Sequence, residues 1–505
     1  MDQSVHRYPS PDGLRVLLAS SEAHPLIKTG GLADVAGSLP LALRELGQDA
    51  RLILPAYPRA ARQLREPRTL CEIKVPGART GVRILGGSLP DHDLPVYLVD
   101  APEHFAREGN PYTDLSGRDW GDNAERFLLF SRVVAQLAQG LPALGWRPEV
   151  LHTNDWQTGL APALLQGVPG RPATVFTIHN LAYQGLFPAG SCAELGLPEA
   201  LFNIDGLEYH GLLSFMKAGL QFADAITTVS PRYAQEITTA EQGCGLDGAL
   251  RARQDRLSGI LNGVDYELWN PATDPLLKAH FDVKRMRGKA SAKRTLQRLL
   301  GLEERADALL FAAVTRLTEQ KGLHLVPPIL PDLIERGGQL VILGDGDTAI
   351  ETALREALAC HPGQAVLRIG YDEALAHRII AGADVILVPS RFEPCGLTQM
   401  YGLRYGALPL VHAVGGLADT VTDCSLDAID DASASGFVFH DFSSDALRGA
   451  MRRAFALRRR PADWNAVQGH AMQQRFDWQE PAQAYRALYQ RLLVPAGTSA
   501  PPVPA

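Results

Sequence analysis

The feature that most constrains the fold of this chain is a regular alternation between short apolar runs and longer segments with helical periodicity. Short runs of Val, Ile and Leu without polar breaks are typical of strands buried on both faces, and such strands occur in parallel sheets covered by helices. The alternation therefore predicts an α/β fold. In the first half we expect strands at residues 15–20, 51–55, 96–99, 149–152, 174–178 and 225–229. The second half repeats the scheme at residues 259–261, 309–314, 339–343, 365–370, 384–389 and 408–412.

The repeated pattern also predicts the domain organisation. A chain of 505 residues is too long for one hydrophobic core. We expect one Rossmann-like, doubly wound domain over residues 1–256 and a second over 257–475. An amphipathic helix over 476–494 is expected to pack back on the first domain, and the Pro-rich residues 495–505 are expected to be disordered. Open sheets bind ligands at the carboxyl ends of their strands, so the predicted site lies between the domains.

Composition excludes several classes of protein. Hydrophobic residues make up 46% and charged residues 21%, which are ordinary values for a globular chain, and no apolar run is long enough for a membrane span. The net charge of -7 argues against general nucleic-acid binding, which requires a basic excess. The polar start of the chain predicts a cytoplasmic protein without a secretory signal. Six dispersed cysteines form no C-x-x-C pair, so neither a disulfide framework nor a zinc site is expected.

A Lys and two glycines follow the first predicted strand. Lys28, Gly30 and Gly31 precede a run whose apolar residues fall on one helical face, so they lie at the start of a helix. Glycines there permit close approach of a ligand, and the unpaired N–H groups of a helix start favour an anion. The alternative is a tight turn with a solvated Lys. The order of residues is not that of a Walker loop.

Two cations follow a predicted strand of the second half. Arg316 and Lys321 lie five residues apart, which would place them on different faces of a helix but allows a loop at a strand end to aim both at one point. The Arg offers a bidentate fork for phosphate oxygens. The alternative is an ordinary pair of surface cations, and the spacing by itself does not separate the two interpretations.

Nine segments together resemble the glycogen and starch synthases. The first is K-T-G-G-L-A-D-V at residues 28–35, and the others follow in the same order as in that family. They lie at residues 110–114, 152–162, 177–185, 214–224, 259–271, 315–323, 390–406 and 415–421. The resemblance extends from about Arg15 to about Leu492 and implies a GT-B type fold with two Rossmann-like domains facing each other across a deep cleft. It also implies retaining transfer of glucose from ADP-glucose to the non-reducing end of an α-1,4-glucan, with release of ADP.

The resemblance assigns catalytic roles to five residues. Arg316 and Lys321 would grip the donor diphosphate, and Glu393 would face the transferred glucose. His179 would line the sugar pocket, although a histidine that merely caps a strand is the alternative. Asp155 would be a carboxylate of the acceptor side or of domain closure.

Further residues are predicted to bind substrates on the same basis. Tyr112 and Asn180 are expected to form walls of the pocket, and a helix is expected to begin near Cys395 or Gly396 with Pro394 in its first turn. The residues expected to contact ADP-glucose are Lys28, Gly30, Gly31, Asn262, Tyr371, Cys395, Gly396, Leu397, Thr398, Gly415 and Gly416.

No cofactor is expected, because in this family the cations replace a metal at the diphosphate. Two D-x-D patterns, at 91–93 and 345–347, superficially resemble the metal-binding element of other sugar transferases, but we assign them no metal. The expected partners are ADP-glucose and glycogen or another α-1,4-glucan, with no nucleic acid and no membrane. The alternatives are a related transferase that uses UDP-glucose and a glucan-binding scaffold without activity.

Overall fold

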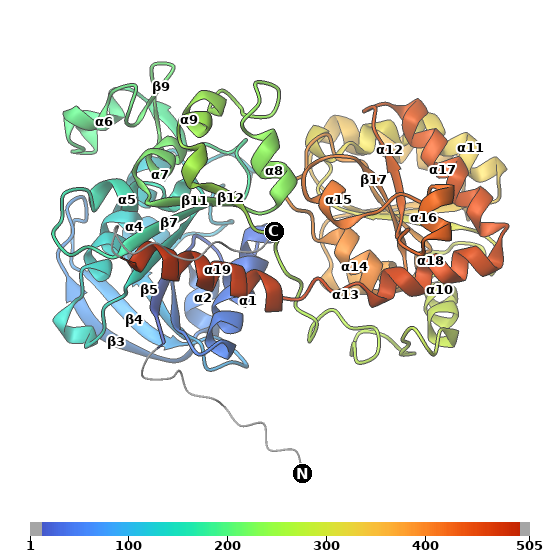
Figure 1. Cartoon of the computed structure of the whole chain (residues 1–505), viewed down its shortest axis with the longest axis horizontal. Helices are drawn as coiled ribbons and strands as arrows, with labels where there is room; N and C mark the ends of the chain where they lie inside the picture. Colours follow the sequence, from blue (N-terminus) through green and yellow to red (C-terminus); the bar gives the residue numbers. More distant parts are fainter. Residues whose placement is uncertain (1–12, 495–505) are drawn as a thin grey trace, which may run out of the picture. The chain divides into compact units, whose positions relative to one another are not determined.

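The structure is a computed structural model that describes residues 13–494, and these divide into two compact units (Figure 1). The first unit contains the chain up to Val229, residues 234–263 and the chain from Trp478. The second contains residues 230–233 and 264–477. Each unit is an α/β domain with its own central sheet, as the alternation of apolar runs predicts.

The sheet of the first unit has nine strands in the order β12-β11-β7-β6-β1-β2-β5-β4-β3. The strands from β12 to β5 in this order are parallel. At the other edge, β4 pairs antiparallel with β5, and β3 pairs antiparallel with β4. The six strands predicted for the first half are all present. Their bounds, with those of the remaining three, are β1 (Arg15–Ala19), β2 (Asp49–Pro55), β3 (Arg65–Ile73), β4 (Val82–Ser88), β5 (Pro95–Asp100), β6 (Val150–Asn154), β7 (Ala173–Ile178), β11 (Ala225–Thr228) and β12 (Leu257–Gly259).

One strand belongs to a different sheet from the one expected. A strand at 259–261 was expected in the second domain, but the strand observed here is β12 at Leu257–Gly259, which pairs in parallel with β11 at the edge of the first sheet. The first unit accordingly continues to Gly263, beyond the boundary expected after residue 256. A short edge strand of this kind buries little apolar surface, so its sequence does not indicate which sheet it joins.

The helices of the first unit cover this sheet, and a small three-stranded sheet follows β7. The small sheet consists of β8 (Leu186–Pro188), β9 (Glu208–Tyr209) and β10 (Leu212–Ser214). The helices are α1 (Gly31–Glu45), α2 (Pro58–Gln63), α3 (Pro102–Phe105), α4 (Asn123–Ala138), α5 (Leu160–Leu164), α6 (Ser191–Glu194), α7 (Phe215–Phe222), α9 (Asp247–Ala252) and α19 (Gln479–Leu493). The short helix α8 (Pro231–Glu236) spans a change of unit.

The last helix of the described chain belongs to the first unit. Trp478, Tyr485 and Tyr489 lie in the core that the first sheet forms with its helices. The Tyr489 hydroxyl lies 2.7 Å from Nδ1 of His152, a buried residue of β6. The predicted helix is therefore present, and both apolar packing and a buried hydrogen bond hold it on this unit. The tail expected to be disordered, residues 495–505, lies outside the described residues.

The sheet of the second unit has six parallel strands in the order β15-β14-β13-β16-β17-β18. The five remaining predicted strands are all present, and only the short last strand was not predicted. The strands are β13 (Leu310–Val314), β14 (Gln339–Gly344), β15 (Ala365–Ile369), β16 (Val385–Val388), β17 (Leu408–His412) and β18 (Phe437–Phe439). The helices are α10 (Arg287–Leu300), α11 (Leu330–Glu335), α12 (Thr348–Ala359), α13 (Glu373–Gly382), α14 (Thr398–Arg404), α15 (Gly415–Thr420), α16 (Leu426–Asp430), α17 (Ser444–Arg458) and α18 (Pro461–Gln473).

The two ends of the main segment of the second unit, residues 264–477, are paired with each other. The Val264 N–H donates to the Phe476 carbonyl at 2.6 Å, and Val264 forms a parallel bridge with Asp477. The Phe476 N–H donates to the Tyr266 hydroxyl at 2.9 Å. The two ends of this segment are thus joined by backbone and side-chain hydrogen bonds.

Candidate active site

Asp155, His179 and Asn180 come together at the carboxyl ends of two neighbouring strands. Asp155 directly follows β6, and His179 directly follows β7. Oδ1 of Asp155 accepts hydrogen bonds from the backbone N–H groups of His179 at 2.7 Å and Asn180 at 3.4 Å. Asp155 has φ of 54°, a conformation that non-glycine residues seldom adopt and that concentrates at functional sites. Three residues predicted for the site therefore form one cluster.

Burial sets the protonation of this cluster. It raises the pKa of the Asp155 carboxyl from 3.8 to about 7, more than the two N–H donors lower it. Burial also lowers the pKa of His179 from 6.5 to about 3, so its imidazole is neutral at pH 7. His179 Nε2 lies 2.8 Å from Oδ1 of Asn154, which as an acceptor assigns the ring proton to Nε2. His179 therefore acts as a neutral, fixed group rather than as a cation.

A second buried carboxylate, Glu22, was not predicted as a site residue. Its side chain is 3% exposed, and Oε2 accepts hydrogen bonds from both the backbone N–H and the hydroxyl of Thr29. Oε1 accepts from the Tyr112 hydroxyl at 3.3 Å. Glu22 thus connects the predicted wall residue Tyr112 to the loop that carries Lys28. One sequence signal could have pointed to Glu22: it follows a buried strand closely. The same criterion had singled out Lys28.

Glu22 and Asp155 influence each other electrostatically. Burial raises the pKa of Glu22 from 4.5 to about 7, and the charge of Glu22 is one of the causes that raise the pKa of Asp155. The negative charge of Glu22 thus makes ionisation of Asp155 less favourable.

The loop with Lys28 ends at a helix start, as predicted. Gly30 is the N-cap residue of α1, and Gly31 is its first residue. The backbone of Gly30 is extended at φ of -160°, and a Cβ added there would meet nothing within 4 Å. Neither backbone strain nor packing against described residues explains this glycine, whereas close approach of a ligand would. Lys28 Nζ donates to Asp34 Oδ1 at 2.7 Å, in the first turn of the same helix.

In the second unit, the partly buried Lys321 forms an ion pair with the buried Glu393. Lys321 Nζ donates to Glu393 Oε2 at 2.6 Å, and the Ser390 hydroxyl donates to the same oxygen at 2.9 Å. Glu393 is 6% exposed. Gly322, with φ of 71°, follows Lys321, and a Cβ on it would lie 1.9 Å from the Pro389 carbonyl oxygen. This close contact of two loops places the Lys beside the Glu.

The helix after Glu393 begins later than predicted. The expected start lay near Cys395 or Gly396, but α14 begins at Thr398, and Leu397 is its N-cap residue. Gly396 has φ of 72°, which is incompatible with a right-handed helix. Pro394 is therefore not in a first helical turn, and the segment 393–397 is a loop between β16 and the helix.

Gly415 and Gly416 pack against this loop. The Gly416 N–H donates to the Glu393 carbonyl at 3.1 Å. A Cβ on Gly415, whose φ is 44°, would lie 1.9 Å from that carbonyl oxygen, and a Cβ on Gly416 would lie 2.2 Å from the Cys395 carbonyl oxygen. Both glycines are thus required for packing, and they fix the backbone that carries Glu393.

Gly415→Ala is expected to destabilise the second unit by about 2–4 kcal/mol and to lower activity, because it combines a left-handed backbone with a backbone clash. Urea unfolding monitored by circular dichroism measures the loss. The matched control is Gly449→Ala in the middle of α17, where an added Cβ meets nothing within 4 Å. That change should stabilise the unit by roughly 0.5–1 kcal/mol. Equal effects of the two substitutions would contradict the packing argument.

The remaining predicted residues also lie near strand ends or unit boundaries. Arg316 is exposed and follows β13 by two residues, and Tyr371 is 61% exposed and follows β15 by the same number. Asn262 is 5% exposed and lies near the end of the first unit, with no hydrogen-bond partner for its Oδ1 among residues 13–494. The predicted residues are therefore divided between the two units.

Both D-x-D patterns have structural roles. Asp93 pairs with Arg65 in the hairpin between β4 and β5. The Asp347 carboxylate accepts N–H groups of Ala349 and Ile350 and caps α12. Across the described part of the chain, no group of three or more His, Cys, Asp or Glu side chains is arranged to hold a metal ion. Over the same residues, no helix has the length and apolar character needed to cross a membrane.

Comparisons with known families cover both units. The family model described as starch synthase catalytic domain matches residues 15–252, and the model described as glycosyl transferases group 1 matches residues 301–467.

Comparisons with individual proteins agree over nearly the full length. The chain is 54% identical to a glycogen synthase of Albidiferax ferrireducens, over 95% of this chain and 99% of the relative. It is 52% identical to one of Leptothrix cholodnii, over 95% and 100%. Among solved structures, the catalytic domain of starch synthase IV from Arabidopsis thaliana, bound to ADP and acarbose, matches with a TM-score of 0.87 and 34% identity over 95% of this chain and 99% of that one. The chain therefore belongs to the family of glycogen and starch synthases.

Proposed function

We propose that this chain elongates glycogen by transferring glucose from ADP-glucose to the non-reducing end of an α-1,4-glucan, with retention of the α configuration. The observation that carries the proposal is the partly buried Lys321–Glu393 pair, placed beside a loop whose backbone Gly415 and Gly416 hold in position. The glycogen synthases at 52–54% identity and the ADP and acarbose bound to the related plant enzyme support the same substrates.

The proposed division of labour assigns the donor to the second unit. Lys321 and Arg316 would hold the diphosphate and stabilise the charge that develops on the departing ADP. Glu393 would fix glucose hydroxyls and oppose positive charge at the anomeric carbon. Because Lys321 is paired with Glu393 without substrate, the arriving phosphate would share the ammonium with that carboxylate. Gly396, Leu397, Thr398 and Tyr371 would complete the nucleotide site.

The first unit would contribute the acceptor side and part of the sugar pocket. Asp155 orients the backbone of His179 and Asn180, and the neutral His179 would present its imidazole and backbone carbonyl to the glucose. Lys28 and Gly31 would approach the phosphates when the units close and exclude water. We propose front-face substitution, in which the leaving phosphate accepts the proton of the attacking hydroxyl. Isolation of a glucosyl ester on Glu393 or Asp155 would contradict it.

The six cysteines fit a reducing compartment, and the cytoplasm is the proposed location. All six, Cys71, Cys192, Cys244, Cys360, Cys395 and Cys424, are free thiols. A protein without disulfides suits a compartment that keeps thiols reduced.

Incorporation of labelled glucose into glycogen tests the function directly. ADP-glucose and UDP-glucose are supplied in parallel, with and without EDTA. We expect transfer from ADP-glucose that resists the chelator, because protein cations replace a metal at the diphosphate. Transfer from UDP-glucose alone would reassign the donor, and loss of transfer in EDTA would contradict the metal-independent clamp. No transfer from either donor would favour the scaffold without activity.

A further inference from the structure

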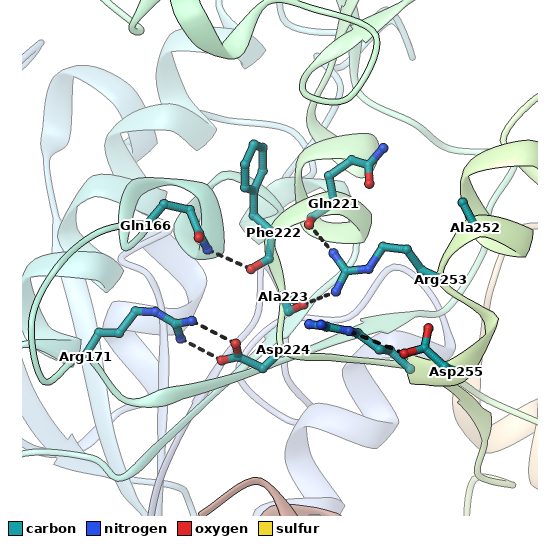
Figure 2. Close-up of a pocket in the computed structure, with 10 residues that line it drawn as sticks. Gln166, Arg171, Gln221, Phe222, Ala223, Asp224, Ala252, Arg253 and Asp255 are labelled. Atoms are coloured by element: carbon teal, nitrogen blue, oxygen red, sulfur yellow. Dashed lines mark hydrogen bonds and ion pairs between the residues drawn. The ribbon is translucent and has the colours of Figure 1, made fainter. Parts of the chain in front are cut away.

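A polar cavity of about 400 Å³ lies at the amino-terminal edge of the first sheet (Figure 2). Its lining residues Arg171, Asp224 and Arg256 come just before β7, β11 and β12. Asp155 and His179 follow the opposite ends of β6 and β7. The cavity is therefore separated from the predicted active site by the length of the strands, and the proposed function does not use it.

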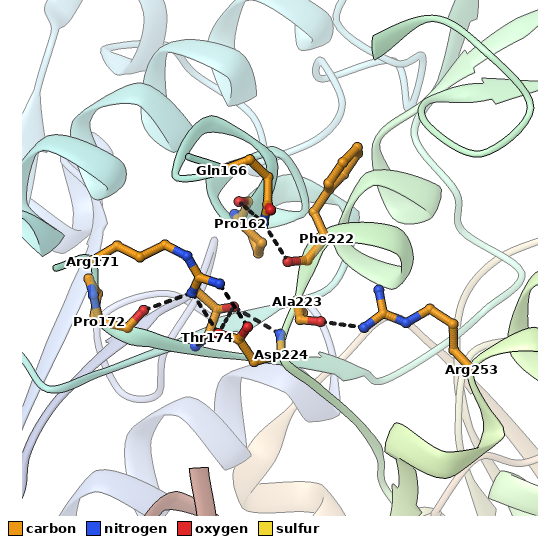
Figure 3. A network of polar contacts seen from close by, with 9 residues as sticks. All are labelled: Pro162, Gln166, Arg171, Pro172, Thr174, Phe222, Ala223, Asp224 and Arg253. Atoms are coloured by element: carbon orange, nitrogen blue, oxygen red, sulfur yellow. Dashed lines mark hydrogen bonds and ion pairs between the residues drawn. The ribbon is translucent and has the colours of Figure 1, made fainter. Parts of the chain in front are cut away.

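One wall of the cavity is a fixed ion pair. Arg171 binds both oxygens of Asp224, at 2.6 and 2.8 Å. Asp224 also accepts the backbone N–H and the hydroxyl of Thr174, at 2.8 and 2.9 Å (Figure 3). This carboxylate is saturated with donors and is neutralised by its own Arg, so it contributes little repulsion toward an anion.

The opposite wall carries positive charge that is not neutralised in the same way. The Arg253 guanidinium donates to the carbonyls of Gln221 and Ala223, which are neutral acceptors (Figure 2). Burial lowers the pKa of Arg253, and the charge of Arg256 lowers it further. Arg256 lies 3.8 Å from Asp255, and both side chains are at least half exposed, so this pair is weak. Three arginines and two aspartates leave a net charge of +1 at the cavity.

We propose that this cavity binds the phosphate monoester of a small metabolite, with Arg253 and Arg256 as its anion-binding residues. A doubly charged phosphate would relieve the repulsion between the two guanidinium groups and accept their remaining N–H donors. The volume exceeds what a phosphate ion alone fills, and the side chains of Gln166 and Gln221 line the remainder. A sugar phosphate, whose hydroxyls can pair with these amides, is therefore favoured over inorganic phosphate.

Helix α7 connects this cavity to the predicted active site. Arg253 binds the carbonyls at its carboxyl end. At its amino end, the N–H groups of Phe215 and Met216 donate to the carbonyls of Gly185 and Gln184, in the segment that follows Asn180. The Phe215 carbonyl also lies so close to Gly159 that a Cβ there would be 2.1 Å from its oxygen. An occupant of the cavity would thus bind the end of a helix whose other end supports the loops after β6 and β7.

Calorimetric titration with ribose 5-phosphate and, separately, inorganic phosphate tests the proposal. The full-length Lys321→Ala variant is used, because it weakens phosphate binding at the proposed donor site and the readout needs no activity. We expect ribose 5-phosphate to bind more tightly than inorganic phosphate. Arg256→Gln should weaken this binding about tenfold, whereas Asp255→Asn should strengthen it by about twofold or more, since it removes a negative charge from the same rim. Both residues are exposed, so neither change threatens folding.

Hydrogen exchange localises the binding. Ribose 5-phosphate should slow exchange at the amides of residues 222–224 and 253–256, and Arg256→Gln should remove that protection. Equal affinities of the three proteins, or protection confined to other segments, would overturn the site. Tighter binding of inorganic phosphate would overturn the preference for a sugar phosphate. None of these outcomes depends on the proposed transferase activity, which the glucose-transfer assay tests separately.

Discussion

Lys321→Ala should lower turnover on the order of 10²-fold or more, the scale observed when a positioned group that stabilises developing charge is removed. The physical reason is that Lys321 is held at 2.6 Å from Glu393, in a partly buried position where an ammonium is poorly replaced by water. Initial rates with saturating ADP-glucose and glycogen measure the effect on kcat.

The matched control is Lys278→Ala, an exposed lysine of the same unit. It should leave turnover unchanged. Because removal of Lys321 also leaves the Glu393 carboxylate without its cation, thermal unfolding of both variants has to accompany the rates. A folded Lys321→Ala enzyme that keeps turnover within about threefold of the wild type would exclude Lys321 as the phosphate clamp.

Asp155→Asn should separate activity from stability. The amide keeps the shape and an oxygen acceptor for the N–H groups of His179 and Asn180 but removes the titratable carboxyl. We expect turnover to fall on the order of 10²-fold, because the role proposed for Asp155 on the acceptor side of the site uses its ionised carboxylate. We also expect the variant to unfold at a higher temperature than the wild type at about pH 8.

The higher unfolding temperature expected for Asp155→Asn follows from proton binding. Burial raises the pKa of Asp155 from 3.8 to about 7, so between these values the folded state holds a proton that the unfolded chain has lost. Wild-type stability therefore decreases as pH rises through this interval and levels off above it. An Asn side chain does not titrate, so it adds no such pH dependence. The stability advantage of the Asp155→Asn variant over the wild type should therefore shrink toward pH 5. Calorimetry at several pH values measures this, with Asp205→Asn on the exposed surface as the control. A variant that is less stable than the wild type at every pH would contradict the buried-carboxyl argument.

The sequence predicted the strands of both sheets well because most of them are buried on both faces. Runs such as Val16–Ala19 and Leu340–Leu343 are fully or almost fully buried, and their composition shows it without knowledge of the neighbours. β3 escaped prediction because its residues are mostly exposed and charged residues interrupt it, so it has no apolar run. The strand predicted at 259–261 overlaps β12 only at Gly259, and its partner β11 could not be inferred from so short a segment.

The site was predicted as a set of residues but not as an arrangement. Family resemblance supplied Asp155, His179, Lys321 and Glu393, but no pattern indicated the hydrogen bonds that join them into two pairs. Glu22 was missed because a single carboxylate in a loop has no distinctive spacing, and its importance depends on burial. The helix start at Thr398 was placed too early because the left-handed backbone of Gly396 is a tertiary property.

The paired segments at Val264 and Asp477 have a mechanical consequence for the second unit. Residues 264–477 make up all of this unit except residues 230–233, and the bridge closes their two ends on each other. A pull on either end is therefore shared with the other end through the hydrogen bonds from Val264 to Phe476 and from Phe476 to Tyr266. The unit can be opened from its ends only if these hydrogen bonds break.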